Sequence, residues 1–411
     1  MRSVQDHLGA VLAAVGPVAP LDVALHDAVG CILARDLIAP RDLPAVAVAA
    51  RDGYAVAAFE TEGAGYASTL TLPVAHDLRA GAATELRLAP GQAVRVASGA
   101  PVPLGADAVV PLEETDRGAV RFAMQRPAAA GQHVRPAGAD VHAGEVVLAA
   151  GTRLGARQIA LAAALGFGRL HVHPTPRVVL LSVGDELAEP GSSRPAQGAV
   201  FEADGHALDA AVRDAGATPV RVGILPDDRH VLREALEDQL VRADLVVVTG
   251  GLSELAGDTV KDVLATLGTV RLDHVAMTPG FRHGFGKVGG ERGEDRAVPL
   301  FALQGDPVAA QVSFEVFVRP ALRAMAGHAE LYRPSVAARA SHGWAAPVGL
   351  RQFVPATVLG TPDEGYRVTP LGDPGAPTVS ALAHANALAV VGEQDTVVHA
   401  GQTVHCLVLE G

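Results

Sequence analysis

Glycines and carboxylates recur directly after short apolar runs, and this combination suits the binding of an anion together with a divalent metal ion. In the clearest case, residues 243–263, three successive valines precede Gly250 and Gly251, and a polar loop then ends at Asp258. Glycines let a ligand approach the main chain, the N–H groups at a helix start attract an anion, and Asp258 could hold a bridging metal. The stretch therefore predicts a strand, a glycine turn and a helix around a binding site.

Two further apolar runs end in the same residue types. Residues 177–183 run into Gly-Asp-Glu at 184–186, and residues 298–303 run into Gly-Asp at 305–306 and a long helix through Met325. Ligands in open α/β sheets bind at the carboxyl ends of strands. Three such ends predict that glycines and acids meet at one shared edge.

The elements around these runs predict the sheet that must position them. Helical patterns at 205–215 and 229–241 alternate with the strands, which is typical of a mostly parallel sheet with helices on both faces. A further helix is expected at 157–165. The motif Gly-x-Gly-x-x-Gly at 284–289 leads into a charged turn instead of a helix, so it predicts a hairpin and not a dinucleotide site.

The remaining segments predict other kinds of structure. The first 45 residues suggest two helices, the second of them at 21–37. Short β-like runs separated by Gly and Pro fill 45–135 and the part after 327, which indicates β domains. His171 and His173 share one face of an expected strand, but no further metal ligands lie nearby in the sequence.

Size and composition exclude several function classes. The 411 residues are too many for one core, and 49% hydrophobic residues are typical of a globular protein. A formal net charge of −12 argues against a general nucleic-acid binder. Two cysteines provide no disulfide framework, and no apolar run approaches the ~20 residues of a membrane span. With no signal-peptide core, the protein is expected to be cytoplasmic.

Several separated motifs, taken in order, resemble the molybdopterin molybdenumtransferases, which are the MoeA proteins and the related E domain of gephyrin. The resemblance covers nearly the full chain. The motifs are Asp-Gly-Tyr-Ala at 52–55, Ser-Gly-Ala-Pro-Val-Pro at 98–103, Gly-Ala-Asp at 138–140, Gly-Asp-Glu-Leu at 184–187, Asp-Asp at 227–228, Gly-Gly at 250–251 through Asp258, Pro-Gly at 279–280 and Gly-Asp-Pro at 305–307. Each is weak alone, but their order and spacing together identify the family.

The resemblance implies a multidomain α/β plus β fold in a four-domain, elongated subunit. Its domains would be a helical and extended linking domain at 1–45 and 136–175, an inserted mainly β domain at 46–135, a doubly wound molybdopterin-binding α/β domain at 176–326 and a C-terminal β barrel at 327–411. Family members are homodimers whose active site lies between the α/β domain of one subunit and the inserted domain of the other. A molybdopterin adenylyltransferase is a further expected partner.

The resemblance also implies a reaction. Family members take adenylylated molybdopterin and molybdate as substrates and, with Mg²⁺, release AMP and leave molybdenum on the dithiolene. Four acids would hold the metal: Glu186, Asp227, Asp228 and Asp258. The catalytic set would be Asp52, Asp140, Glu186 and Asp258, and the cofactor-binding set Ser98, Gly250, Gly251, Ser253, Pro279, Gly280, Arg282, Gly305 and Asp306.

Departures from the family pattern fall on the molybdate side. Where Pro-Gly-Lys-Pro is usual, the chain has Pro-Gly-Phe-Arg at 279–282, and Thr278 stands where a lysine is frequent. Leu-Gln-Gly-Asp-Pro at 303–307 replaces Leu-Pro-Gly-Asn-Pro, which adds a carboxylate. These changes would weaken oxyanion binding, because the planar fork of Arg282 cannot occupy an ammonium's position. Two hypotheses remain: a divergent enzyme, or a gephyrin-like scaffold that binds a partner such as the tubulin-like bacterial division protein.

Overall fold

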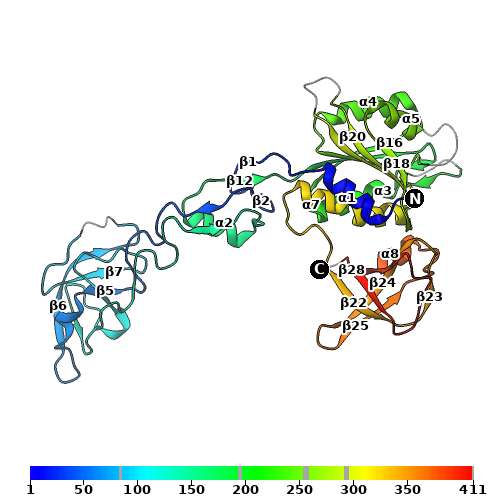
Figure 1. Cartoon of the computed structure of the whole chain (residues 1–411). Helices are drawn as coiled ribbons and strands as arrows, with labels where there is room; N and C mark the ends of the chain where they lie inside the picture. Colours follow the sequence, from blue (N-terminus) through cyan, green and yellow to red (C-terminus); the bar gives the residue numbers. More distant parts are fainter. Residues whose placement is uncertain (83–85, 193–196, 253–258, 291–295, 410–411) are drawn as a thin grey trace. The chain divides into compact units, whose positions relative to one another are not determined.

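The computed structural model describes residues 1–82, 86–192, 197–252, 259–290 and 296–409. The chain forms two compact units (Figure 1). The first comprises Met1–Val23, Ala28–Ala34 and His171–Gly411, and the second Ala24–Asp27 and Arg35–Leu170. Among the described residues, no helix is both long and apolar enough to cross a membrane. The domain boundaries given above stay a prediction.

A six-stranded sheet, in the order β16-β13-β17-β21-β20-β18, forms the centre of the first unit. Four neighbours are parallel: β16 (Thr218–Leu225), β13 (Arg177–Val183), β17 (Leu245–Thr249) and β21 (Val298–Leu303). The antiparallel strands β20 (Arg282–Val288) and β18 (Arg271–His274) complete one side. The predicted runs at 177–183 and 298–303 are confirmed. The Gly-x-Gly-x-x-Gly motif at 284–289 lies in β20 and the residue after it. β20 pairs antiparallel with the next strand, β21, as the predicted hairpin requires.

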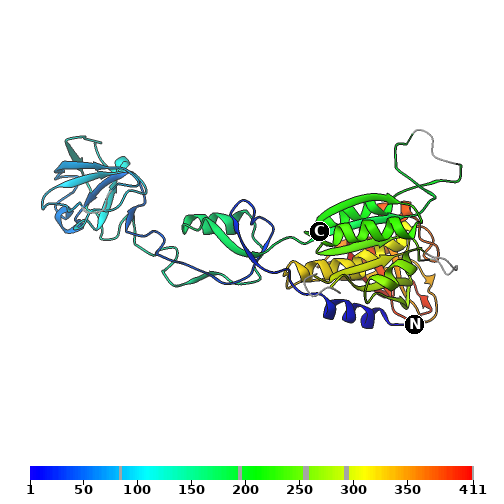
Figure 2. The same ribbon diagram turned by 90° about the horizontal axis from the view of Figure 1, so that it is seen from above.

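Helices cover both faces of this sheet (Figures 1 and 2). One face carries α1 (Val4–Ala14), α3 (Asp204–Asp214), α6 (Pro307–Ser313), η3 (Phe314–Val318) and α7 (Arg319–Met325), and the other α4 (Arg229–Leu240) and α5 (Thr259–Leu267). Strand side chains alternate between the two cores: Leu180 packs with the first set and Leu181 with the second. Both-face burial explains why the strands are continuous apolar runs. The predicted helices at 205–215, 229–241 and 307–325 are confirmed within a residue.

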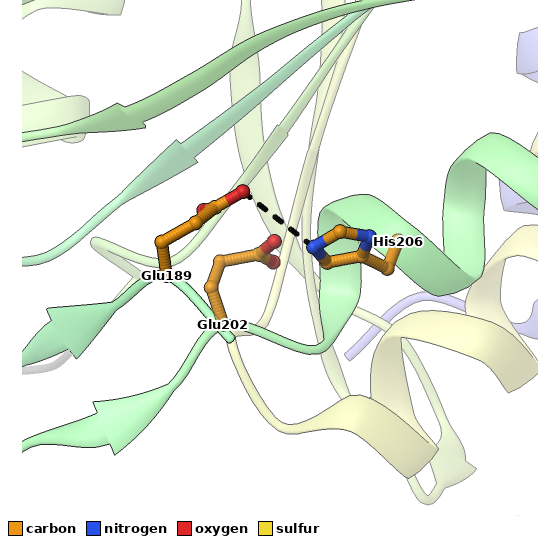
Figure 3. Close-up of side chains that lie close together, drawn as sticks. All are labelled: Glu189, Glu202 and His206. Atoms are coloured by element: carbon orange, nitrogen blue, oxygen red, sulfur yellow. Dashed lines mark ion pairs between the residues drawn. The ribbon is translucent and has the colours of Figure 1, made fainter. Parts of the chain in front are cut away.

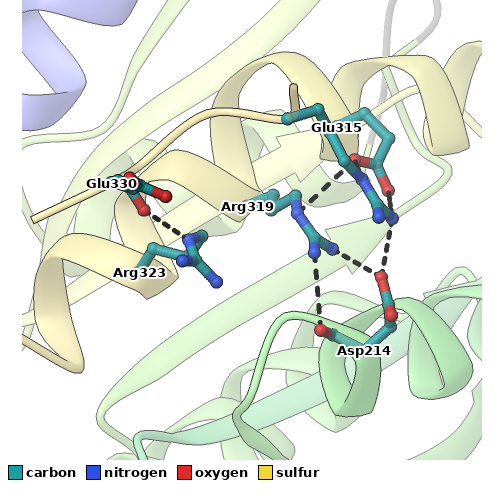
Figure 4. A network of polar contacts seen from close by, with 6 residues as sticks. Asp214, Glu315, Arg319, Arg323 and Glu330 are labelled. Carbon is teal, nitrogen blue, oxygen red and sulfur yellow. Dashed lines mark hydrogen bonds and ion pairs between the residues drawn. The ribbon is translucent and has the colours of Figure 1, made fainter. Parts of the chain in front are cut away.

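A buried ion-pair network fixes α3 against the helical layer that follows β21 (Figure 4). The guanidinium of Arg319 is 8% exposed and lies 2.7 Å from the Asp214 carboxylate. Arg333 bridges the same carboxylate, at 2.6 Å, to Glu315, at 2.9 Å. The two arginines and Glu315 are largely buried and are compensated within the network, which matters because an unpaired buried charge would be costly, whereas the Asp214 side chain is 55% exposed.

The C-terminal region is a closed β barrel, as predicted. Its ring runs β24-β25-β22-β28-β26, and a further pairing between β26 and β24 closes it. The strands are β22 (Ser335–Ala340), β24 (Arg351–Thr361), β25 (Gly365–Pro370), β26 (Ala387–Val391) and β28 (Thr403–Val408). Apolar side chains such as Val354, Val368 and Cys406 fill the interior. The short helix α8 (Val379–His384) precedes β26.

The second unit is built mainly from β structure, as predicted for 45–135. Its five-stranded sheet has the order β8-β5-β7-β6-β9. The strands are β5 (Gly53–Val56), β6 (Leu70–Leu78), β7 (Ala93–Val96), β8 (Ala108–Pro111) and β9 (Arg121–Met124). Tyr54 and Phe122 stack within its core, with ring centroids 4.0 Å apart. The helix α2 (Ala156–Ala164) confirms the one expected at 157–165.

The helix predicted at 21–37 is wrong. The segment contains β1 (Leu21–Ala24) and β2 (Ile32–Leu33), which flank β12 (Arg169–His173) in a three-stranded sheet. Gly30, at φ +85°, stands between them in a conformation that a helix does not contain. The apolar spacing fits a helix, but pairing with β12, far away in sequence, decides the structure.

Candidate active site at the carboxyl edge of the parallel sheet

The four parallel strands end in register, which confirms the predicted shared edge. Leu225 pairs with Val183, Ser182 with Thr249, and Thr249 with Leu303. Because β16 and β17 lie on opposite sides of β13, the chain changes direction between β13 and β17. A crevice for ligands is expected outside such a switch point. Gly184–Glu186 follow one of these two strands and Gly250–Gly251 the other.

The glycine turns bring main chain against main chain at this edge. Gly250 has φ +89°, and a Cβ there would lie 2.3 Å from the carbonyl oxygen of Val183. A Cβ on Gly305 would lie 3.2 Å from the Cα of Gly250, and Gly251 has φ +63°. No other residue type fits Gly250 without moving a neighbouring strand. The Gly250 amide donates to the carbonyl of Leu303 at 3.2 Å, so the turns pack closely and place main chain without side chains beside the switch point.

Acidic side chains from two strand ends lie together. The Asp185 amide donates to the Asp227 carboxylate at 3.4 Å, and the Asp227 amide donates to the Asp185 carboxylate at 3.1 Å. Both side chains and Glu186 are exposed. Asp185 was absent from the metal set expected from the sequence, although it stands next to Glu186. Its pairing with Asp227 could be found only from the tertiary structure.

Asp228, the neighbour of Asp227, has a different role in the structure. It is the N-cap of α4, and its carboxylate accepts hydrogen bonds from the amides of His230 at 2.8 Å and Val231 at 3.0 Å. These bonds lower the pKa of Asp228. A carboxylate engaged as a cap is a poorer metal ligand, so Asp227 is the stronger candidate of the two. Asp258 and Ser253 lie outside the described residues.

The turn at Pro279 and Gly280 packs against α6. Gly280 has φ +86°, and a Cβ there would lie 2.6 Å from the Ser313 hydroxyl. Arg282 then reaches back to the end of β17, where its guanidinium donates to the carbonyl of Leu252 at 2.9 Å. The guanidinium also lies over the ring of Phe281, 4.8 Å from the centroid.

Arg282 lines a pocket of about 200 Å³ that includes two more basic side chains, Lys261 and His274. Asp273 is the one acid among the described lining residues, and it is paired with Arg2 at 3.0 Å. The described lining thus places the Lys261 ammonium and the Arg282 guanidinium beside apolar side chains. Lys261 and His274 were not among the residues expected from the sequence, because α5 and β18 carry them to Arg282 only in the folded chain.

Asp306, the additional carboxylate, caps a helix. It is the N-cap of α6 and accepts a hydrogen bond from the amide of Ala309 at 2.8 Å. Burial, together with the carboxylates of Glu202 and Asp306, raises the pKa of Asp204 to about 7. The family resemblance places the Asp306 carboxylate on the molybdate side of the site. In the structure this carboxylate already accepts a hydrogen bond from the start of α6.

The residues that the resemblance places on the face contributed across the dimer, namely Asp52, Ser98 and Asp140, lie in the second unit. The carboxylate of Asp52 accepts a 2.6 Å hydrogen bond from the amide of Ser98, so these two residues are adjacent. The Ser98 hydroxyl donates to the carbonyl of Ala50 at 3.3 Å. Asp52, Ser98 and Asp140 are all exposed.

A buried histidine pair supports the Pro279–Gly280 turn. His283 lies 2.6 Å, through Nε2, from the carbonyl of Gly280, and its ring is 5.4 Å from that of His7 on α1. Both rings meet Phe317 edge-on. Burial, and then Arg2, lowers the pKa of His7 to about 4, and burial lowers that of His283 to about 3. The pair, 276 positions apart, gives no signal in the sequence.

The buried pair of His7 and His283 should lower the free energy of unfolding in acid. Its folded pKa values lie below the ordinary 6.5, so the unfolded chain binds more protons and stability falls as the pH drops from about 6.5 towards 4. We expect His7→Leu to reduce that loss by about 2 kcal/mol at pH 4.5 and to change stability much less at pH 8, where the imidazole is neutral in both the folded and the unfolded chain. Calorimetric melting at both pH values measures this; equal shifts at both would contradict it.

Comparison with known proteins identifies the family to which the chain is similar. Residues 2–166 match the MoeA N-terminal region (domain I and II), residues 179–324 a probable molybdopterin binding domain, and residues 337–409 the MoeA C-terminal region (domain IV). The molybdopterin molybdenumtransferases 1 and 2 of Mycobacterium tuberculosis are each 40% identical to the chain, with 98% of both sequences covered.

A solved structure has the same fold. The molybdopterin biosynthesis MoeA protein from Pyrococcus horikosii superimposes with a TM-score of 0.81 at 28% sequence identity, covering 100% of this chain and 99% of that one. With similarity over its whole length to the named transferases and to this structure, the chain belongs to the MoeA family of molybdopterin molybdenumtransferases.

Proposed function

We propose that the protein inserts molybdate into adenylylated molybdopterin in an Mg²⁺-dependent reaction that releases AMP. The observation that carries this proposal is the meeting of bare glycine turns and exposed acids at the switch point of the parallel sheet. Both substrates are anions, and only a site that combines peptide N–H groups, cations and a metal can hold them together.

The acids at the ends of β13 and β16 suit Mg²⁺. Asp185, Glu186 and Asp227 are exposed carboxylates, and the amide bonds between Asp185 and Asp227 keep two of them adjacent. Mg²⁺ takes carboxylate oxygens and retains water, so a partly exposed acid group fits it. A bound Mg²⁺ supplies charge neutralisation at the pyrophosphate and activation of the attacking oxygen. Asp258 completes this set by resemblance.

The glycine turns position the pterin-phosphate part of the substrate. Gly251, at φ +63°, would let phosphate oxygens approach the main chain, whereas Gly250 packs against Val183 and donates its amide to the Leu303 carbonyl at 3.2 Å. Ser253, Gly305 and the turn at Pro279 and Gly280 belong to the same subsite. Asp52 and Ser98 of the inserted domain, with Asp140 of the linking domain, act on the substrate from the second subunit of a homodimer. A molybdopterin adenylyltransferase supplies the adenylylated substrate.

The cationic pocket around Arg282 receives the molybdate. Lys261 and Arg282 supply positive charge in place of the charges that the changed Pro-Gly-Phe-Arg turn lacks, and His274 lines the same pocket. Charge-assisted hydrogen bonds from these groups hold an oxyanion better than neutral donors do. The changed turn is therefore compatible with catalysis.

Arg282→Gln tests this assignment. We expect the molybdate concentration for half-maximal AMP release to rise about tenfold, because one charge-assisted hydrogen bond is lost, with little change at saturating molybdate. Arg271→Gln, on the exposed neighbouring strand, is the matched control and should change nothing. An unchanged molybdate requirement in Arg282→Gln would remove Arg282 from the site. Retained nucleotide binding without AMP release in the unmodified protein would instead support the gephyrin-like scaffold.

A further inference from the structure

A second group of metal-binding side chains lies beside the β13 strand end, apart from Asp185 and Asp227. Glu189, Glu202 and His206 each offer one ligand atom, and these atoms all lie within 4.8 Å of one another (Figure 3). Each comes from a different element. Glu189 follows β14 (Leu187–Ala188), Glu202 follows β15 (Val200–Phe201), and His206 stands in the first turn of α3.

The main chain fixes this arrangement without a ligand. β14 and β15 pair in parallel, and the Glu202 amide donates to the carbonyl of Ala188 at 2.9 Å. α3 starts two residues after Glu202, so His206 is held one turn away from it. The three side chains therefore converge through regular structure and not through a chance contact of long side chains.

Glu202 is the observation that points to a cation. It is 2% exposed, and its Oε1 accepts hydrogen bonds from the Ser182 hydroxyl at 3.1 Å and the Gly205 amide at 2.5 Å. Among the described residues its Oε2 has no hydrogen-bond partner. Figure 3 shows the carboxylate directed between Glu189 and His206. A buried carboxylate oxygen is costly without a close positive partner.

Arg221 occupies the cation's place only in part. Its guanidinium lies 2.7 Å from Glu189 but 3.8 Å from Oε2 of Glu202, and 3.0 Å from Nδ1 of His206. One positive charge faces two carboxylates, so the group keeps a net negative charge. Arg221 is 23% exposed in its side chain and can leave towards solvent. A divalent ion would balance both carboxylates and contact the imidazole directly.

We propose that Glu189, Glu202 and His206 bind a divalent transition-metal ion, with Arg221 displaced. One imidazole and two carboxylates with a water molecule suit Zn²⁺ in tetrahedral geometry, whereas Mg²⁺ prefers oxygen ligands alone. The site would join β14, β15 and α3, and the first two already meet where the Val200 amide donates to the carbonyl of Glu186 at 2.8 Å. The metal is thus structural and distinct from the Mg²⁺ of the proposed reaction.

Titration of the chelator-treated full chain with Zn²⁺, followed by calorimetry and by thermal melting, tests the proposal. We expect one site per chain, and a loss of affinity of about tenfold or more in Glu202→Gln and in His206→Ala. Arg221→Gln should bind Zn²⁺ more tightly, because the competing guanidinium is gone. Asp209→Asn, in α3 and paired with Arg213, should leave Zn²⁺ binding unchanged.

Three results would overturn the proposal. They are absence of Zn²⁺ binding at millimolar concentration, unchanged affinity in Glu202→Gln, and weaker binding in Arg221→Gln. Circular dichroism of each variant separates loss of a ligand from loss of fold. Since the measurement needs no substrate, it stands or fails independently of the proposed molybdate insertion.

Discussion

Asp227→Asn is expected to lower Mg²⁺-dependent AMP release by about a hundredfold or more while the protein stays folded. The amide of asparagine retains the shape of the carboxylate and its acceptor for the Asp185 amide, so the bonds between the two strand ends survive. What disappears is one negative charge at the metal, and removing a metal's charge stabilisation costs several kcal/mol of the barrier. AMP release at saturating Mg²⁺ and molybdate measures the effect.

The neighbouring position sharpens this test. Asp228→Asn should have a small effect, because asparagine caps a helix as well as aspartate and the amides of His230 and Val231 keep their acceptor. Asp238→Asn, on the exposed side of α4, is a further control. If Asp228→Asn abolished turnover and Asp227→Asn did not, the assignment of the two adjacent acids would be reversed.

Gly250→Ala is expected to destabilise the α/β domain by several kcal/mol. A non-glycine residue at φ +89° costs about 1–3 kcal/mol. In addition, the new Cβ would meet the Val183 carbonyl oxygen at 2.3 Å, and that oxygen belongs to a buried strand that cannot move independently. The melting temperature of the full chain should fall by many degrees, and binding of adenylylated molybdopterin should be lost with it.

Gly191 is a matched control that separates the backbone cost of a positive φ from the clash of the new Cβ. Gly191 has φ +86°, almost the same conformation, but a Cβ there would meet nothing within 4 Å. Gly191→Ala should therefore show only the conformational cost, about 1 kcal/mol. Equal melting temperatures for the two variants would mean that the close approach of β17 and β13 does not constrain this turn.

The sequence alone predicted where the parallel strands end, because strands buried on both faces are apolar runs with sharp ends. The runs at 177–183 and 298–303 are mostly apolar and end abruptly before glycine and acid, so their ends could be placed to the residue. The segment 21–37 has no such signal. Its strands exist only through pairing with β12, which lies more than a hundred residues away, and local spacing therefore predicted the wrong element.

The site itself was predicted by residue type but not by role. Asp227 and Asp228 are indistinguishable in the sequence, and only hydrogen bonds in the folded chain show that one caps α4 while the other meets Asp185. Likewise, the lost lysine of the Pro-Gly-Lys-Pro turn suggested an eroded oxyanion site. The Lys261 and His274 side chains that line the pocket with Arg282 come from α5 and β18, whose proximity depends on tertiary packing.

The most direct test of the account is to titrate the purified protein, in its own oligomeric state, with adenylylated molybdopterin, Mg²⁺ and molybdate while AMP is measured. We predict that AMP appears only when Mg²⁺ and molybdate are both present, in proportion to molybdenum bound by the product. Nucleotide that stays bound and uncleaved under all these conditions would contradict the proposed catalysis.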